Sequence, residues 1–488
     1  MKIKKTQIFS KTTWPLLFLL VFNFWSCNPF HKNQDNNQQI KKNKKAIVTG
    51  PQITNTEDEQ EERLEVVEEE GFVKVKGQHF ELAGKPYFYL GTNFWYGMNL
   101  GSKGAGGDRE RLLRELNQLK LIGVKNLRIM AGSEGPDSEP YRMVPSMQPA
   151  PGIYNPDILE GLDFLLVEMK KRGMKGVLCL NNFWNWSGGM SQYIAWSGAK
   201  KTIPYPPPHP GGTWLVYQLF VEKFYQNEKA KELFNNHLRF IINRENSISK
   251  IAYKNDSTIM SWELANEPRG ITKTKYFRNW IHETAALIKS IDPNHLVTVG
   301  SEGSTSSNFA GTDLILDHQS PFVDYATIHL WVQNWGIYDP EDVEGTFSRS
   351  ITYAKKYLEK HEQQAITLGK PLVLEEFGIS RDGNNHQAET PVIVRDQYYK
   401  ILFEEAFKLA KKSKSAMSGV NFWAWGGEGR PKKPGDLWKV GDDFIGDPAH
   451  ETQGWYSVFN NDYSTLEIIS TYTKLFDELG YSTIIIKE

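Results

Sequence analysis

The chain has few cysteines, no excess of charge of either sign, and no apolar run long enough to cross a bilayer. Cys27 and Cys179 are its two cysteines, which excludes a disulfide framework, and the apolar stretch "KGVLCLNNF" predicts that Cys179 is a buried thiol. The formal net charge of −1 argues against a nucleic-acid partner, because such proteins carry a clearly basic face. The apolar run "WPLLFLLVFNFW" is too short for a membrane-spanning helix.

Two motifs that would indicate a bound cofactor are also missing. The glycines of "GSKGAGG", which follow the first strand expected in a barrel or sheet, do not fit the G-x-G-x-x-G pattern of dinucleotide-binding folds. No cluster of His, Cys and Asp has the spacing of a metal site. We therefore expect neither a metal nor an organic cofactor.

The N-terminal residues have the pattern of an export signal. A basic segment, "MKIKKTQIFSK", precedes the apolar run, and Ser26 and Cys27 follow it. A cysteine at this point resembles the lipid attachment site of bacterial lipoproteins, although Trp25 stands where Gly or Ala is usual. We expect residues 1–26 to be a lipoprotein-type signal peptide and Cys27 to carry a lipid anchored in a membrane. The alternative is an ordinary signal peptide with a chance cysteine.

Residues 27–70 are polar and charged without a sustained apolar period, so we expect a disordered tether. A short acidic helix over residues 58–70 is the alternative for its last part. We expect residues 71–488 to form the catalytic body. That body begins with two alternating segments joined at Gly77, which predict a β-hairpin.

Eight apolar strands alternate with helical patterns through the rest of the body. Helices carry the expected start signals, such as Asp108 before one and Asn155 before another. Eight strand–helix units predict an α/β fold, a (β/α)8 TIM barrel with long loops at the C-terminal strand ends. An open doubly wound sheet is the alternative, which the missing glycine-rich loop argues against. The predicted strands span residues 87–94, 124–130, 175–183, 258–267, 295–303, 324–331, 370–378 and 418–426, and the longer helices span 214–246, 274–290, 347–368 and 392–412.

Glutamates end two of these strands, where barrel enzymes place their working residues. Glu267 directly precedes Pro268, which a central strand does not tolerate, and Glu376 lies two residues before Gly378. An ionised carboxylate is costly to bury unless it is paired, so a buried strand has no need for one. Glycoside hydrolysis requires two carboxyl groups flanking one bond. The pair therefore predicts a glycosidase, and two carboxylates in a structural network are the alternative.

The chain is also rich in aromatic residues, with 15 Trp, 21 Tyr and 26 Phe. Aromatic rings have large apolar faces that can stack on sugar rings, which suits a neutral ligand rich in hydroxyl groups. A large aromatic core is the alternative.

The motifs around the two glutamates resemble those of a known family. "WELANEP" and "LVLEEFG" look like the acid/base and nucleophile strands of glycoside hydrolase family 5, a retaining (β/α)8 family. Its endo-β-1,4-mannanase branch has segments similar to "LRIMAGSEG", "NNFWNWSGG", "PHPGG", "IHLWVQNWG", "FWAWGG" and "GDPAHETQGWYSVF". The likeness begins near Phe72, reaches the last predicted helix, and keeps the same order of motifs along six strands.

The resemblance implies a role for each matching polar residue. Glu267 would be the general acid/base and Glu376 the nucleophile of a double displacement. Asn266 would hold the 2-hydroxyl group of the sugar. Arg128 would orient Glu376 and keep it ionised, and His329 would line the subsite of the cleaved sugar.

The resemblance also implies roles for the aromatic residues in binding the sugar chain. Trp423 would form the stacking floor of that subsite, with Trp425 as the alternative on the same strand face. Trp331 stands where the family has Tyr, whose hydroxyl reaches the nucleophile; an indole N–H donates but cannot accept, so we do not expect the same role. Asn182 replaces a His of many relatives, which bears on the choice of substrate. The remaining predicted substrate contacts are Asn182 itself and the walls for flanking sugars, Trp184, Trp95 and Trp331.

Three further glutamates remain. Glu263 faces the same way as Glu267 but lies deeper in its strand, and we expect it to be a hydrogen-bonded structural residue. Glu134 and Glu302 lie at strand exits, where sugar binding and a structural role are both open.

The resemblance implies an exported, monomeric endo-β-1,4-mannanase whose partner is a β-mannan polysaccharide or oligosaccharide. A β-1,4-glucanase of the same family is the nearest alternative, because mannose and glucose differ only at C2. A non-catalytic glycan-binding surface lipoprotein is the alternative from another class. A binding protein has no need for two aligned carboxyl groups, which argues against it.

Overall fold

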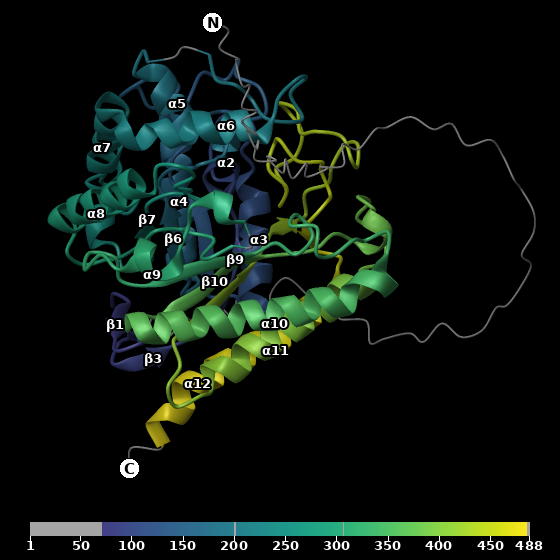
Figure 1. Ribbon diagram of the computed structural model, residues 1–488. Coiled ribbons are helices and arrows are strands. Elements are labelled where there is room, and N and C mark those ends of the chain that lie inside the picture. Colours follow the sequence, from purple (N-terminus) through teal and green to yellow (C-terminus); the bar gives the residue numbers. More distant parts are fainter. Residues whose placement is uncertain (1–70, 200–201, 306, 486–488) are drawn as a thin grey trace, which may run out of the picture. The chain divides into compact units, whose positions relative to one another are not determined.

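The computed structural model describes residues 71–199, 202–305 and 307–485. Parallel strands form one sheet in the order β8-β7-β6-β5-β4-β11-β10-β9. Strands β6, β7, β9 and β10 of this sheet are labelled in Figure 1. Across the seam between β8 and β9, the Asp324 N–H donates to the Val297 carbonyl at 2.8 Å. The sheet is thus a nearly closed barrel. Its strands are β4 (Tyr89–Asn93), β5 (Asn126–Met130), β6 (Lys175–Cys179), β7 (Ile259–Glu263), β8 (Leu296–Thr298), β9 (Ala326–Leu330), β10 (Leu372–Phe377) and β11 (Met417–Phe422).

The predicted (β/α)8 barrel and its eight strands are confirmed, although most strands end earlier than predicted. In β7 the last paired residue is Glu263, four positions before Glu267. At the strand ends the backbone leaves the hydrogen-bonded ladder to build loops. A predicted site residue such as Glu267 therefore lies in the loop just after its strand and not in the strand itself. Cys179, on β6, is a buried free thiol as expected.

The helices follow the strands on the outside of the barrel. The caps at Asp108 and Asn155 are confirmed, because each side chain accepts a backbone N–H of the helix that follows. The predicted single helix over residues 214–246 is wrong: Asn227 caps a new helix by accepting the Ala230 N–H. The α-helices are α2 (Gly97–Leu100), α3 (Arg109–Leu121), α4 (Pro156–Lys171), α5 (Gly189–Trp196), α6 (Trp214–Val221), α7 (Glu228–Ile242), α8 (Thr274–Ile291), α9 (Leu314–His318), α10 (Val343–Leu368), α11 (Ile393–Ala410) and α12 (Tyr463–Ile485).

A small antiparallel sheet lies at the N-terminal end of the barrel. The hairpin predicted at Gly77, which has φ +64°, is confirmed and is extended by a third strand. Phe80 of this sheet and Val73, just before it, cluster with Tyr89 of β4 and with Tyr325, just before β9. The sheet therefore covers this end of the barrel, opposite to the ends where the predicted site residues lie. Its strands are β1 (Lys74–Lys76), β2 (His79–Leu82) and β3 (Lys85–Tyr87).

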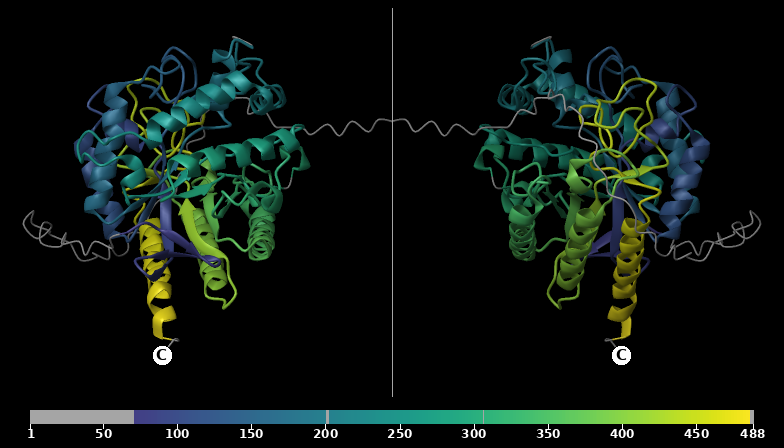
Figure 2. Two further views of the ribbon diagram at one scale, coloured as in Figure 1. Left: turned by 90° about the vertical axis from the view of Figure 1, so that its left-hand side faces the viewer. Right: turned by 90° about the vertical axis from the view of Figure 1, so that its right-hand side faces the viewer.

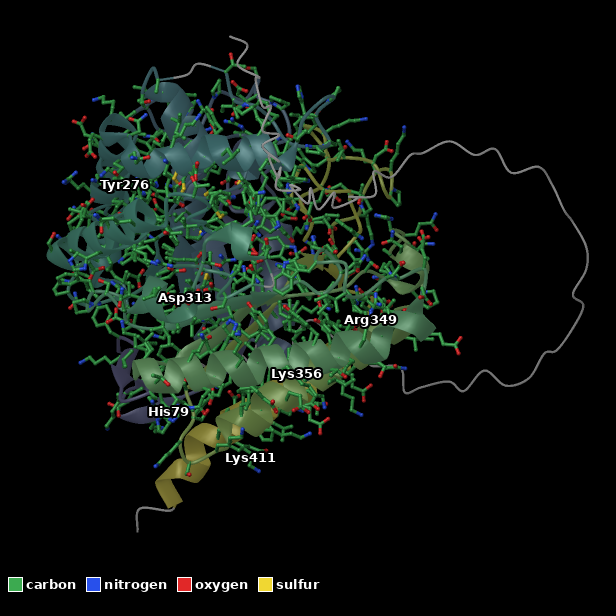
Figure 3. The ribbon with its side chains drawn as sticks, viewed as in Figure 1. His79, Tyr276, Asp313, Arg349, Lys356 and Lys411 are labelled. Carbon is green, nitrogen blue, oxygen red and sulfur yellow. The ribbon has the colours of Figure 1, made fainter. Side chains whose placement is uncertain are left out.

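The outer helices present polar faces to solvent. Helices α10, α11 and α12 pack side by side, and α12 also contacts β3 (Figures 1 and 2). Arg349 and Lys356 are exposed on α10, and Lys411 is exposed at the end of α11 (Figure 3). Among the helices of the described ranges, none combines the length and apolar character needed to cross a membrane.

The longest loops leave the C-terminal ends of β5, β6 and β11. They span residues 131–155, 180–213 and 423–462. The last loop is fixed at both ends because β12 (Trp425–Gly427) pairs with β13 (Val458–Phe459). The predicted long loops on the C-terminal face are therefore present.

Candidate active site

Arg128 lies at the centre of the candidate site, on β5 and almost completely buried. Its Nε and Nη2 atoms donate to the two carboxylate oxygens of Glu263 at 2.8 and 2.5 Å. Nη1 donates to Glu376 and, at 3.0 Å, to Asn93. Nη2 also donates to the side-chain oxygen of Asn266 at 2.8 Å. One planar guanidinium thus connects groups from β4, β7 and β10 and fixes their relative positions.

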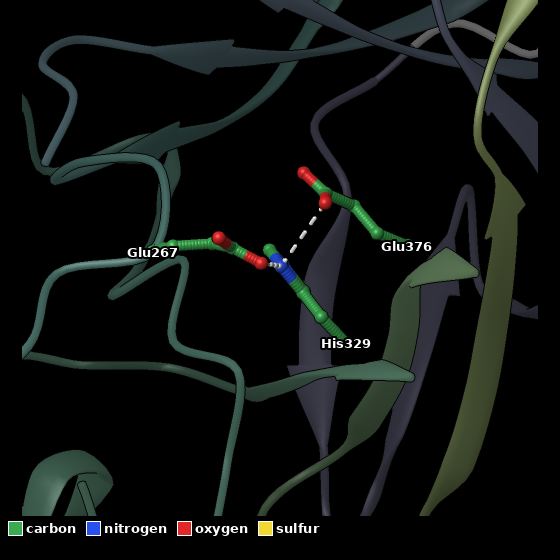
Figure 4. Close-up of side chains that lie close together, drawn as sticks. All are labelled: Glu267, His329 and Glu376. Carbon is green, nitrogen blue, oxygen red and sulfur yellow. Dashed lines mark hydrogen bonds and ion pairs between the residues drawn. The ribbon is translucent and has the colours of Figure 1, made fainter. Parts of the chain in front are cut away.

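His329 and Glu376 occupy paired positions on the neighbouring strands β9 and β10. His329 Nδ1 lies 3.2 Å from Glu376 Oε2 and 2.7 Å from Glu267 Oε1 (Figure 4). His329 Nε2 lies 3.4 Å from Glu375 Oε2. The pairing of β10 with β9 shifts between Leu374 and Glu376, and such a bulge lets both consecutive glutamates reach the histidine. His329 therefore stands among three carboxylates.

Glu267 projects from a turn that follows β7. Its φ of +49° lies in the left-handed region, which non-glycine residues rarely adopt and which is often found at functional sites. Its N–H donates to the Gly300 carbonyl at 2.9 Å, and Pro268 follows. The Trp184 indole N–H donates to Glu267 Oε2 at 2.6 Å. Both carboxylate oxygens therefore accept hydrogen bonds, one from His329 and one from Trp184.

The two glutamates are close enough to act on one bond. One oxygen of each, together with His329 Nδ1, forms a group whose atoms all lie within 4.8 Å of one another. Retaining glycosidases hold their carboxyl groups about 5–5.5 Å apart, whereas inverting enzymes separate them by about 6.5–9.5 Å to admit a water. Glu267 and Glu376 are 7% and 2% exposed. Their spacing fits a nucleophile and an acid/base, with no room for an attacking water between them.

Burial and neighbouring charges set the ionisation of this cluster. Burial disfavours a charged imidazole, but Glu376, Glu267 and Glu375 outweigh it and raise the pKa of His329 well above its ordinary value. Burial likewise opposes the charge on Arg128, whose pKa the surrounding glutamates raise. The cluster therefore holds two cations among its carboxylates.

Within the described ranges, Glu267, His329 and Glu376 also have atoms close enough together to hold a metal ion. A metal requires His329 as a neutral ligand. Here its imidazole carries a proton between two glutamates, and the Arg128 guanidinium already contacts Glu376. The charges of the site fit a proton network better than a divalent cation.

Asn266 and Asn182 form a pair beside Arg128. The Asn266 amide donates to the Asn182 side-chain oxygen at 3.2 Å, and that oxygen also accepts the Trp184 backbone N–H at 2.9 Å. The Asn182 amide donates to Ser187 Oγ at 3.1 Å, and Asn182 is 0% exposed. We expected Asn182 to bind substrate; the structure instead places it beneath Asn266, where it supports Asn266 and the backbone of Trp184.

Trp423 and Trp331 lie next to each other beside the nucleophile. Their ring centroids are 5.9 Å apart, with planes at 77°. The Trp331 indole N–H donates to Glu376 Oε2 at 3.2 Å. We did not expect this tryptophan to reach the nucleophile as a tyrosine hydroxyl would, but its N–H supplies the same donor.

Trp425 and Trp95 do not join the catalytic centre. Trp425 is fully buried on β12, where its indole N–H donates to Glu115 Oε2 on α3 at 3.0 Å. Its predicted place beside Trp423 is wrong, because β11 ends at Phe422 and the alternation of a strand does not continue past its end. The Trp95 indole N–H donates to the Gly446 carbonyl at 3.0 Å, so Trp95 supports the loop after β11.

Two of the remaining glutamates have structural partners. Glu263 binds Arg128 as predicted for a buried support, and burial raises its pKa to about 7 despite the opposing effect of Arg128. Glu302 accepts the Arg269 guanidinium at 2.6 and 2.7 Å. Arg269 itself was not singled out by the sequence reasoning, although its place directly after "NEP" could have indicated it.

Asn93 and Glu375 also contact the centre without having been predicted as site residues. Asn93 is the last residue of β4 and bonds Arg128, and Glu375 precedes the nucleophile. A polar residue at the end of a buried strand was the signal for Asn93. Glu375 could not be identified in this way, because the alternation of side chains along a strand places it on the face opposite to that of Glu376. Only the bulge in β10 brings it to His329.

Comparisons with known proteins agree with this geometry. A sequence model described as GH family 5 beta-mannosidase-like matches residues 70–480. The "Putative mannan endo-1,4-beta-mannosidase 9" of Oryza sativa subsp. japonica is 32% identical over 365 residues, which cover 72% of this chain and 81% of that protein.

Two solved structures extend the likeness. The glycoside hydrolase family 5 mannosidase from Rhizomucor miehei gives a TM-score of 0.78 at 40% identity, covering 85% of this chain and 99% of that one. The endo-beta-1,4-mannanase from Thermotoga petrophila gives a TM-score of 0.60 at 28% identity, covering 80% and 77%. With a family match across nearly the whole described body and two glutamates at the required spacing, the chain belongs to glycoside hydrolase family 5.

Proposed function

We propose that the protein hydrolyses internal β-1,4-mannosidic bonds of mannan, galactomannan or glucomannan with retention of configuration. The observation that carries this proposal is the Glu267–Glu376 pair, with an oxygen of each within 4.8 Å of the other. The names of the rice relative and of the Thermotoga petrophila enzyme support mannan as the substrate and internal cleavage as the mode.

In the first chemical step Glu376 attacks the anomeric carbon while Glu267 gives a proton to the leaving oxygen. The Arg128 guanidinium and the Trp331 N–H both donate to Glu376, which orients its carboxylate for the attack. Glu376 loses its charge when it forms the glycosyl ester. The His329 proton then stabilises the carboxylate left on Glu267, 2.7 Å away.

In the second step Glu267 acts as a base. It takes a proton from water, the water attacks the anomeric carbon, and Glu376 leaves as a carboxylate. Two inversions at the same carbon give net retention. The donors that oriented Glu376 before attack stabilise the charge that returns to it.

A β-1,4-glucanase remains the nearest alternative substrate assignment, because the two sugars differ only in the orientation of the 2-hydroxyl. Asn266 is the residue proposed to hold that hydroxyl. Its side chain is fixed by Arg128 and Asn182, so its amide can adapt little to the other epimer. Rates on mannan and on cellulose at equal concentration separate the two assignments.

A β-mannosidase that removes terminal mannose is the second candidate. The description of the matching family and the Rhizomucor miehei mannosidase support it. Within this chain, Trp214 at the start of α6 and His450 in the loop after β11 have ring centroids 6.3 Å apart. We take this contact between α6 and the loop after β11 to restrict the passage of a long chain, which favours cleavage near an end.

Product analysis on linear mannan, galactomannan, glucomannan and cellulose tests these alternatives. Internal cleavage releases a ladder of oligosaccharides and lowers viscosity early, whereas terminal cleavage releases mannose alone. The matched control is Glu376→Ala, which removes the nucleophile. A variant as active as wild type would refute the catalytic assignment, and binding without release of reducing ends would favour a non-catalytic glycan-binding protein.

We also propose export of the protein and a lipid on Cys27, followed by a tether over residues 27–70. These residues lie outside the described ranges, so the support is the order of basic, apolar and small residues before Cys27. Incorporation of labelled palmitate that disappears in Cys27→Ala tests the lipid. Size-exclusion chromatography with light scattering tests the proposed monomer.

A further inference from the structure

Trp184 contacts the acid/base residue Glu267 from outside the barrel strands, and Arg269 in turn contacts Trp184. We propose that Arg269 is a positioning residue: its guanidinium fixes the Trp184 indole in the orientation that lets the indole N–H hold Glu267. The proposal rests on the acid/base role proposed for Glu267. It gives Trp184 a task in the chemical step, beyond that of a wall for a flanking sugar.

The contact between Trp184 and Glu267 is short and directional. The indole N–H donates to Glu267 Oε2 at 2.6 Å, while His329 occupies Oε1 at 2.7 Å. The Trp184 backbone N–H is itself tied to Asn182 at 2.9 Å. With one donor on each oxygen, rotation of the carboxylate would break at least one hydrogen bond, so its plane is set by its neighbours.

Arg269 lies over the face of the same indole. The guanidinium carbon is 4.8 Å from the ring centroid, within the range of a cation–π interaction. Two of its nitrogens donate to Glu302 at 2.6 and 2.7 Å, and Nη1 donates to Gln218 at 3.0 Å. The Glu302 side chain is 1% exposed. Because its edges are held by these partners, the guanidinium presents a fixed flat face to Trp184.

A lysine cannot reproduce this arrangement. An ammonium group keeps the charge but has neither the plane that stacks on an indole nor the fork that matches a carboxylate. Arg269 is therefore suited to holding a ring in one orientation. A loose indole would leave Glu267 Oε2 without its donor and allow the acid to turn away from the leaving oxygen.

The same contact bears on the pH range of activity. A donor to a carboxylate favours its ionised form, so losing the Trp184 N–H favours the protonated acid. The groups that face or electrostatically affect Glu267 are His329, Glu376, Arg269, Glu302 and Glu451. All of these remain in Trp184→Phe, so a change in the pH profile reports the N–H alone.

The test compares leaving groups in three variants. Trp184→Phe keeps a ring but removes the N–H, Arg269→Lys keeps the charge but removes the stack, and Arg278→Lys is the matched control. Arg278, on the outer helix α8, binds the buried Asp317 at 2.9 Å, and neither residue belongs to the site described above. Each variant is assayed as kcat/KM on mannotriose and on 2,4-dinitrophenyl β-mannoside, whose leaving group departs without a proton.

We expect the first two variants to lose about tenfold or more on mannotriose, since general acid catalysis contributes 10²–10⁴-fold. On the dinitrophenyl substrate they should stay near wild type. The upper limb of the pH–rate profile of Trp184→Phe on mannotriose should move to higher pH, because the lost N–H no longer favours the ionised carboxylate. Arg278→Lys should match wild type in all three measurements.

Equal losses on the two substrates, or an upper limb that does not move, would overturn the assignment. Covalent labelling with 2-deoxy-2-fluoro-β-mannosyl fluoride needs Glu376 but no acid, so it counts intact sites and corrects each rate for misfolded protein. A wild-type protein inert on every β-mannoside would refute the proposed function instead. In that case the β-glucosides that correspond to the two β-mannoside substrates would still test the roles of Trp184 and Arg269, by the same comparison of leaving groups.

Discussion

Replacing Arg128 with methionine tests the charge balance at the centre of the barrel. The change keeps much of the side-chain length but removes a guanidinium that donates five hydrogen bonds, two of them to Glu263. Glu263 is 0% exposed, so its carboxylate has no water to replace the lost partner. Leaving one member of a buried ion pair unpaired costs about 3–5 kcal/mol. We expect Arg128→Met to lose that much unfolding free energy at neutral pH.

The loss should depend on pH in a defined direction. Burial already raises the pKa of Glu263 to about 7, and Arg128 opposes that rise. Without Arg128 the pKa of Glu263 rises further, so the folded protein takes up a proton that the unfolded chain does not hold. A raised pKa stabilises the folded state at low pH and ceases to do so as pH increases through it. The variant should therefore be least stable, relative to wild type, on the alkaline side.

Urea denaturation at about pH 5 and pH 8 measures both effects, with Arg128→Met compared with Arg128→Met/Glu263→Gln. The double variant removes the orphaned carboxylate and should recover part of the lost stability, a coupling of about 1–3 kcal/mol. Activity should not return, because Glu376 still lacks its guanidinium. A single variant within about 0.5 kcal/mol of wild type, or losses that simply add, would refute the reasoning.

Three further predictions concern other parts of the molecule. Burial raises the pKa of Glu134 to about 7, so its stabilising effect is complete below about pH 4.5 and is lost as pH rises through 7. Glu263 keeps its own raised pKa in Glu134→Gln, so the unfolding free energy of this variant should still fall with pH, but by about 3 kcal/mol less than that of wild type; thermal unfolding across this range measures the difference. Trp331→Phe removes the N–H that donates to Glu376 at 3.2 Å, which should lower kcat/KM about tenfold while Trp331→Tyr retains more activity; aryl mannoside kinetics decide. His450→Ala removes the ring that meets Trp214, which should shift products from mannose towards longer oligosaccharides on chromatography if the loops restrict passage; an unchanged product pattern would argue against that restriction.

The barrel was predictable because each strand is a short apolar run and several helices, such as α3 and α4, carry their own start signals. The long helix predicted over residues 214–246 shows where this fails. Asn227 followed by Glu228 is a start signal inside an apolar, helical pattern, and the chain uses it to begin a second helix. A local cap outweighed the continuity of the pattern.

Only those site residues that lie at or just after the end of a predicted strand could be predicted from the sequence. Glu267, Glu376, Arg128 and His329 converge as expected, because parallel strands bring their C-terminal ends to one place. Trp425 was misplaced because strand alternation was carried past the end of β11. Contacts such as the one between Arg269 and the Trp184 ring depend on loop conformation, which spacing along a strand does not determine.

The small sheet beneath the barrel has a consequence for how the enzyme meets its substrate. Lys175, the first residue of β6, donates to the Gly71 carbonyl at 3.1 Å, so the chain enters the body at the end opposite to the two glutamates. The mouth of the barrel, where a polysaccharide would bind, and Gly71, where the described chain begins, therefore lie at opposite ends of the body.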